Sequence, residues 1–125
     1  NWTYQQVPVH YELLLSEDLN RESNYATLIH ELAHLYCGHI GSPKKKWWPD
    51  RRGLPAIVEE FEAECVSYLV CARAGIESPS ESYLASYVNR GDKVPPLSLE
   101  CVMKAAGLLE AMGRERLKPR KKNNE

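Results

Sequence analysis

Apolar residues recur at spacings of three and four along this chain, which is the pattern of amphipathic helices. The first such segment follows polar residues at 20–24 that suit a helix N-terminus. Its predicted buried stripe consists of Ala26, Ile29, Ala33, Cys37 and Ile40. The second segment begins at Pro55, which a helix tolerates in its first turn, and runs to Ala74 before the terminator Gly75. Its predicted stripe consists of Val58, Phe61, Cys65, Tyr68 and Leu69.

Two further helices are predicted towards the C-terminus. One covers residues 80–89 and is ended by Gly91. The other covers residues 98–117 and is opened by Ser98, which follows two prolines. Its apolar face consists of Val102, Ala105, Ala106, Leu109 and Met112. Residues 41–53 contain two prolines and two glycines, so they predict a loop between the first two helices.

A two-residue period precedes the first helix and predicts a half-buried strand. The apolar positions of this period are Val7, Val9, Tyr11, Leu13 and Leu15. Pro8 restricts the strand to a sheet edge or to its first residues, and residues 2–6 are suited to form a partner strand. The predicted fold class is therefore α+β, mostly helical, with a small N-terminal β-sheet or hairpin.

Composition agrees with one compact domain. The chain has 125 residues, of which 43% are hydrophobic and 26% charged, as in an ordinary soluble protein. We predict a domain at 1–117 and a basic, flexible tail at 118–125. Asn1 rather than Met begins the chain, which is compatible with an upstream domain outside it. A net charge of -1 argues against direct nucleic-acid binding, and no segment approaches the roughly 20 apolar residues of a membrane span.

The segment His30-Glu31-Leu32-Ala33-His34 carries the strongest chemical signal. Histidines four residues apart lie on one helix face, so both imidazoles can converge on one zinc ion. Zinc lowers the pKa of a bound water to roughly 7. Glu31 lies about 100° around the helix from His30, where its carboxylate would sit beside the metal as a general base. Chance occurrence in an ordinary helix is the alternative, and the position of the pair beside a buried stripe favours zinc.

A catalytic zinc usually takes three protein ligands, and the second helix offers the third. Glu60 and Glu64 share a face at the margin of the apolar stripe, whereas Glu62 points largely the other way. A solvated acidic face is the alternative for any single glutamate, but a carboxylate at that margin needs a partner. We predict Glu60 as the ligand and Glu64 as an outer acceptor for a ligand histidine. The reverse assignment, with Glu64 as the ligand, stays open.

Residues 27–34, then 60–64 and the apolar run to 72, resemble the ImmA/IrrE family of bacterial zinc metallopeptidases. Residues 71–76 and 82–87 are also similar to the zincin domain of ArdC-type antirestriction proteins. This resemblance implies a minimal zincin-like metallopeptidase fold with one zinc ion per chain. It implies that His30, His34 and one of Glu60 or Glu64 bind the ion, and that Glu31 is the catalytic base. Typical members carry a small amide or acid where this chain has Glu64, which is a departure from the family pattern.

The same resemblance implies a biological role. Members of the family commonly cleave or antagonise a helix-turn-helix repressor. The implied function is a zinc-dependent endopeptidase that acts on such a DNA-binding regulator in bacteria or mobile elements. The alternative is a non-catalytic regulatory module that masks a repressor and contains structural zinc. Metal-dependent cleavage of the partner separates the two.

Four cysteines lie on predicted helix faces, which favours reduced, buried thiols in a cytoplasm over a disulfide framework. A thiolate of Cys37 or Cys65 at the open zinc position is the alternative to core packing. Trp47 and Trp48 are predicted to pack as a hydrophobic lid, with substrate contact as the alternative.

Stabilisation of an oxyanion requires one more polar group near the metal. The candidates, by proximity in the sequence alone, are His10, Tyr36 and His39.

Overall fold

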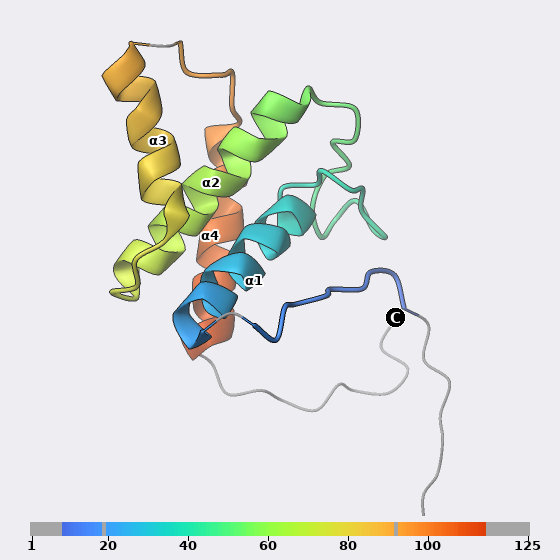
Figure 1. Cartoon of the computed structure of the whole chain (residues 1–125). Coiled ribbons are helices and arrows are strands. Elements are labelled where there is room, and N and C mark those ends of the chain that lie inside the picture. The colour runs from blue at the N-terminus through green and yellow to red at the C-terminus, as the bar shows by residue number, and fades with distance from the viewer. Residues whose placement is uncertain (1–8, 19, 92, 115–125) are drawn as a thin grey trace, which may run out of the picture.

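A computed structural model describes residues 9–18, 20–91 and 93–114. Within these ranges the chain forms four helices and no strand. The helices are α1 (Arg21–Tyr36), α2 (Ala56–Arg73), α3 (Pro79–Arg90) and α4 (Leu99–Arg114). Contacts with all three other helices make α2 the central element, and α1 and α4 also contact each other. Figure 1 shows α1 and α2 side by side in front of α4, with α3 along the other side of α2.

Local capping explains why the predicted helix boundaries are close to the observed ones. The Asn20 side chain accepts a hydrogen bond of 2.8 Å from the backbone N–H of Ser23 and so caps α1. Gly91 adopts a left-handed φ of 67° and ends α3. The hydroxyl of Ser98 accepts a hydrogen bond of 3.2 Å from the backbone N–H of Cys101, at the start of α4. The prediction for the last helix is confirmed to Arg114, because residues beyond it lie outside the described part of the chain.

The hydrophobic core forms where α1, α2 and α4 meet. Its buried members are Ile29, Ala33, Cys37, Ala63, Val66, Val70, Val102, Ala105, Ala106 and Leu109. The predicted stripes are wrong at three positions, because Ile40, Tyr68 and Met112 are 52%, 39% and 45% exposed. Ile40 lies beyond the end of α1, so helical periodicity no longer sets the direction of its side chain. On α2 the buried face is centred on Val66 and Val70 and turns Tyr68 towards solvent.

The predicted N-terminal strand is wrong, and with it the α+β, zincin-like fold class. Residues 9–18 contain no strand, and the described chain is an all-helical bundle. Val9 and Leu14, one from each set of alternating positions, are 75% and 80% exposed, so neither face of the segment is buried. An alternating pattern of apolar residues does not by itself stabilise a strand, because the backbone N–H and C=O groups of the strand also need a hydrogen-bonding partner. Residues 2–6, the predicted partner, lie outside the described residues.

Residues 37–55 connect α1 to α2 without helix or strand, as predicted for 41–53. This loop folds back onto the end of α1, where the backbone N–H of Arg51 donates a hydrogen bond of 2.8 Å to the Gly38 carbonyl. Gly38 has a φ of 80°, and a Cβ at this position would overlap the backbone carbonyl of Pro49. The close approach of the two backbones therefore requires glycine and brings Arg51 towards α2.

Two further observations concern the chain as a whole. No helix among the described residues is long and apolar enough to span a membrane. The predicted basic tail at 118–125 lies outside the described residues.

Candidate metal centre

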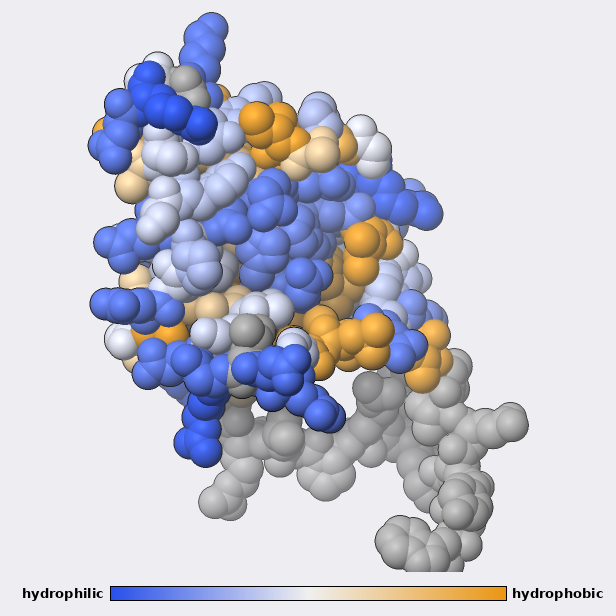
Figure 2. Space-filling model, in the orientation of Figure 1, coloured by the Kyte–Doolittle hydropathy of each residue, from blue (hydrophilic) through white to orange (hydrophobic). Residues whose placement is uncertain are grey.

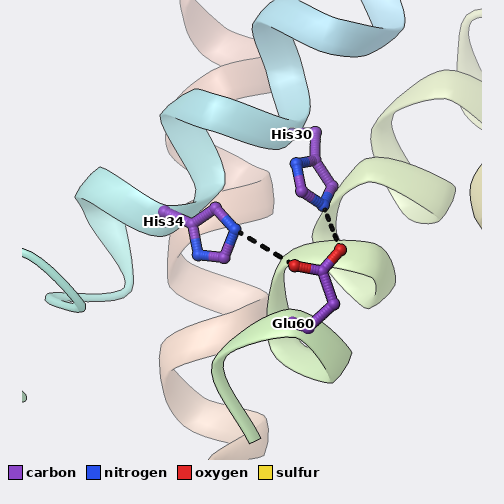
Figure 3. Close-up of side chains that lie close together, drawn as sticks. All are labelled: His30, His34 and Glu60. Carbon is purple, nitrogen blue, oxygen red and sulfur yellow. Dashed lines mark hydrogen bonds and ion pairs between the residues drawn. The ribbon is translucent and has the colours of Figure 1, made fainter. Parts of the chain in front are cut away.

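Helices α1 and α2 bring three predicted zinc ligands together. His30 and His34 lie one turn apart on α1, with ring centroids 5.0 Å from each other. Glu60 approaches from α2, with Oε1 2.9 Å from His30 Nε2 and Oε2 3.6 Å from His34 Nε2. Figure 3 shows the carboxylate between the two rings. One ligand atom from each residue lies within 4.8 Å of the other two.

This geometry fits a zinc ion. Ligand atoms at about 2.0–2.1 Å from zinc in a tetrahedral site are about 3.4 Å from one another. The two distances from Glu60 to the histidines, one from each carboxylate oxygen, are 2.9 and 3.6 Å and so are close to that value. Two imidazoles and one glutamate are a donor set that catalytic zinc uses. Both histidine side chains are 21% exposed and Glu60 is 42% exposed, so solvent can reach the centre.

Glu64 contacts the same histidine nitrogen as Glu60. Its Oε1 lies 3.1 Å from His30 Nε2, and its side chain is only 12% exposed. The outer acceptor predicted for this residue would contact the other ring nitrogen of a ligand histidine. Glu60 reaches both histidines, so its position fits a shared ion best, and Glu64 stays the alternative ligand.

Glu31 lies at the exposed side of the centre. Its side chain is 49% exposed, and Oε1 lies 3.6 Å from His30 Nδ1. This contact is with the nitrogen that Glu60 does not face. This exposure leaves the Glu31 carboxylate accessible to water.

Protonation differs between the two histidines in the metal-free protein. The hydrogen bond with Glu64, opposed by burial, raises the pKa of His30 from 6.5 to about 9. Burial lowers the pKa of His34 to about 4, helped by the neighbouring histidines. At neutral pH His30 therefore holds a proton that a metal must displace, whereas His34 is already neutral.

A buried polar network lies behind His34. Its Nδ1 lies 2.8 Å from His39 Nδ1, and His39 Nε2 lies 2.7 Å from Glu62 Oε1. Glu62 is fully buried and accepts two further hydrogen bonds, of 2.7 and 2.8 Å, from the Arg51 guanidinium. The backbone N–H of Ser98 donates the fourth hydrogen bond, of 2.7 Å. Burial raises the pKa of Glu62, but these donors hold it below its ordinary value.

The sequence prediction missed this role of Glu62. A usable signal was present, because Glu62 lies four residues from both Val58 and Val66 and therefore on an apolar face. A carboxylate in that position requires a buried partner. Periodicity could not identify Arg51 as that partner, because the contact depends on how the loop folds back.

Cys37, His39 and Glu62 form a second group whose ligand atoms lie within 4.8 Å of one another. Packing explains this group better than a metal. Both oxygens of Glu62 already accept two hydrogen bonds each, and burial raises the pKa of the Cys37 thiol to about 12. Burial likewise raises the pKa of Cys65 to about 11, so neither thiol supplies a thiolate at neutral pH. All four cysteines are free.

The predicted oxyanion candidates occupy three different environments. His39 is 5% exposed, and both of its ring nitrogens have hydrogen-bond partners. Tyr36 packs edge-on against Trp48, with ring centroids 5.1 Å apart. His10 is exposed in the segment before α1. Because both ring nitrogens of His39 already have hydrogen-bond partners, His39 itself has no group free to bind an oxyanion.

Trp48 packs into the loop as predicted, whereas Trp47 stays half-exposed. The indole N–H of Trp48 donates a hydrogen bond of 2.8 Å to the Gly41 carbonyl. Trp47 is 48% exposed, and the Lys44 ammonium lies 5.0 Å from its ring centroid.

A cavity of about 340 Å³ opens beside His30, Glu60 and Glu64. Small or hydroxyl-bearing side chains from α1, α2 and the start of α3 form much of its wall: Ser23, Ala26, Thr27, Ser67, Pro79 and Ser80. Its volume is at the lower end of the range for small-ligand sites. Figure 2 shows hydrophilic side chains gathered in the middle of this face, over the region where α1 and α2 lie side by side.

No protein-family model, curated protein or solved structure matches this chain. The resemblance to the ImmA/IrrE and ArdC families therefore depends on the motif residues, and the chemistry of the centre on its geometry.

Proposed function

We propose that this protein is a zinc-dependent endopeptidase. The convergence of His30, His34 and Glu60, with one ligand atom of each within 4.8 Å of the other two, is the observation that carries the proposal. These are the three ligands that a catalytic zinc site requires, and they come from two helices packed against each other. The three side chains are partly exposed, so the centre is open to solvent.

Each residue of the centre has a role in this proposal. His30, His34 and Glu60 hold zinc, which when bound lowers the pKa of a coordinated water to about 7 and polarises a carbonyl. Glu31 accepts the proton of the attacking water and delivers it to the amine that leaves. The cavity beside Glu60 and Glu64 receives a substrate side chain of moderate size.

The proposed substrate is a helix-turn-helix repressor or a similar regulatory protein. This part of the proposal comes from the motif resemblance at residues 27–34 and 60–64. Cleavage of such a protein would allow transcription of the genes that it represses.

Cleavage of a natural partner tests the function. The purified protein is incubated with a helix-turn-helix repressor from the same organism, with zinc or with a chelator, and products are identified by mass spectrometry. We expect a specific fragment that the chelator abolishes and that the Glu31→Gln protein does not produce. Tight binding of the partner without any fragment, at one zinc per chain, would instead support the non-catalytic masking module.

A further inference from the structure

A chain of two hydrogen bonds, one buried and one partly buried, connects Glu62 through His39 to His34. We propose that Glu62 and His39 are positioning residues that fix the tautomer of His34, with the proton on Nδ1 and the lone pair on Nε2. The benefit to metal binding depends on the proposed zinc centre, but the tautomer itself is a property of the metal-free protein.

Glu62 determines which group donates and which accepts in these hydrogen bonds. An ionised carboxylate only accepts hydrogen bonds and has about four lone-pair positions. Four N–H groups occupy them: Arg51 Nη1 and His39 Nε2 at Oε1, and Arg51 Nη2 and Ser98 N at Oε2. His39 Nε2 must therefore carry a hydrogen and donate it.

The next step is the charge of His39. Arg51 is always protonated, so its charge and that of Glu62 already cancel. A cationic His39, at 5% exposure, would add a buried charge without a carboxylate of its own. His39 is therefore neutral, and with its hydrogen on Nε2 its Nδ1 has only a lone pair.

The last step follows at His34. Because His39 Nδ1 accepts, the nitrogen 2.8 Å away, His34 Nδ1, must donate. The lone pair of neutral His34 is then on Nε2, which is the atom 3.6 Å from Glu60 Oε2. When one ring nitrogen of a histidine donates a hydrogen bond, the other nitrogen is unprotonated and ligates the metal. These hydrogen bonds therefore fix the tautomer of His34 that can ligate a metal already in the metal-free protein.

The experiment measures the tautomer directly. The metal-free protein, labelled with ¹⁵N in its histidines, is examined by NMR at neutral pH, where the chemical shifts of the two ring nitrogens identify which one carries hydrogen. We expect His34 to be protonated at Nδ1 and His39 at Nε2. Protonation of His34 at Nε2 in the folded wild-type protein would overturn the proposal.

Two substitutions at His39 separate positioning from packing. Leucine fills space but neither donates nor accepts, whereas a glutamine amide offers an acceptor and a donor as the neutral ring does. We expect His39→Leu to weaken Zn²⁺ binding by about 10- to 100-fold, the usual effect of losing an outer partner, and His39→Gln to retain most of the affinity. Affinity is measured with Zn²⁺ alone against a fluorescent chelator, and circular dichroism verifies folding.

Equal affinity in wild type and a folded His39→Leu protein would contradict the positioning role. If His39→Leu does not fold, the ¹⁵N measurement on the wild-type protein decides. Failure of the proposed peptidase function leaves a distinct result: the tautomer and the difference in zinc affinity persist, but no partner is cleaved.

Discussion

Three glutamates around the two histidines differ in exposure, which suits them to different tasks. Glu31 and Glu60 are 49% and 42% exposed, whereas Glu64 is 12% exposed. A base must meet water and substrate, and a ligand must reach the shared ion. In the proposed zinc centre, the exposure of Glu31 suits proton transfer and the reach of Glu60 to both histidines suits metal binding, whereas Glu64 shares His30 Nε2 with Glu60.

Glu31→Gln tests the base. The amide preserves the shape of the side chain but cannot accept the proton, so we expect normal zinc content with cleavage reduced by at least about 10²-fold. Metal analysis and initial rates on the same preparation give both quantities. Unchanged cleavage would mean that another group is the base.

Glu60→Ala and Glu64→Ala, compared as a pair, test the third ligand. Loss of a ligand should abolish zinc retention during purification, whereas loss of a supporting carboxylate should weaken affinity by about 10- to 100-fold. We expect the larger effect from Glu60→Ala because Glu60 reaches both histidines. The reverse order would make Glu64 the ligand.

Zinc affinity should rise with pH. The hydrogen bond with Glu64 raises the pKa of metal-free His30 to about 9, so between 6.5 and 9 zinc must displace a proton that ordinary histidine would already have lost. We expect about tenfold tighter binding per pH unit from neutral pH towards 9, and a smaller slope in Glu64→Gln, where the pKa of His30 falls. Competition with a chelator of known pH dependence measures both slopes, and identical slopes would contradict this coupling.

At the scale of elements, the loop at 37–55 supplies His39 and Arg51 to the polar network behind His34. Its backbone returns to the end of α1 at Gly38, which places Arg51 against Glu62. The helices carry the candidate ligands, and the loop carries the arginine whose charge pairs with the buried Glu62 carboxylate.

Gly38→Ala tests this close approach, with Gly53→Ala as the control. Both glycines have positive φ, but only at Gly38 does an added Cβ meet another backbone, that of Pro49. Each change should cost about 1–2 kcal/mol for a left-handed alanine. We expect Gly38→Ala to cost about 1–3 kcal/mol more, the usual effect of overpacking, in the free energy of unfolding from urea titrations. Equal losses would show that the loop moves away without cost.

The helices and the placement of the two histidines on one helix face were predictable from sequence because their signals are local. Capping residues such as Asn20 and Ser98 lie within three residues of the groups that they bind, and the two histidines need only one helical turn. The predicted strand was wrong because alternation near Val9 says nothing about a pairing partner. The pairing of Arg51 with Glu62 was missed because it depends on a backbone approach between separate segments.

At the scale of the whole molecule, Glu62 joins three segments of the chain. It lies on α2 and accepts hydrogen bonds from His39 and Arg51, both in the loop at 37–55, and from Ser98 immediately before α4. One fully buried side chain thus connects α2, the loop and the start of α4.

Glu62→Gln should destabilise the protein far more than Glu110→Gln. Glu110 likewise pairs with an arginine, Arg73 of α2, but the side chain of Arg73 is 58% exposed. Breaking a buried pair costs about 3–5 kcal/mol, whereas an exposed pair contributes about 0–1 kcal/mol. Urea unfolding of the two variants gives the comparison, and similar losses would show that Glu62 is less critical than its burial indicates.

The four donors of Glu62 also limit how this sequence can change over evolutionary time. Loss of Arg51 or His39 alone leaves a buried carboxylate short of donors, and loss of Glu62 alone leaves a guanidinium without its partner. Single replacements are therefore expected to be removed by selection, whereas joint replacements by well-packed apolar residues preserve the bundle. Among homologues, positions 39, 51 and 62 should covary, and lineages that exchanged all three would retain the fold without the preset tautomer of His34.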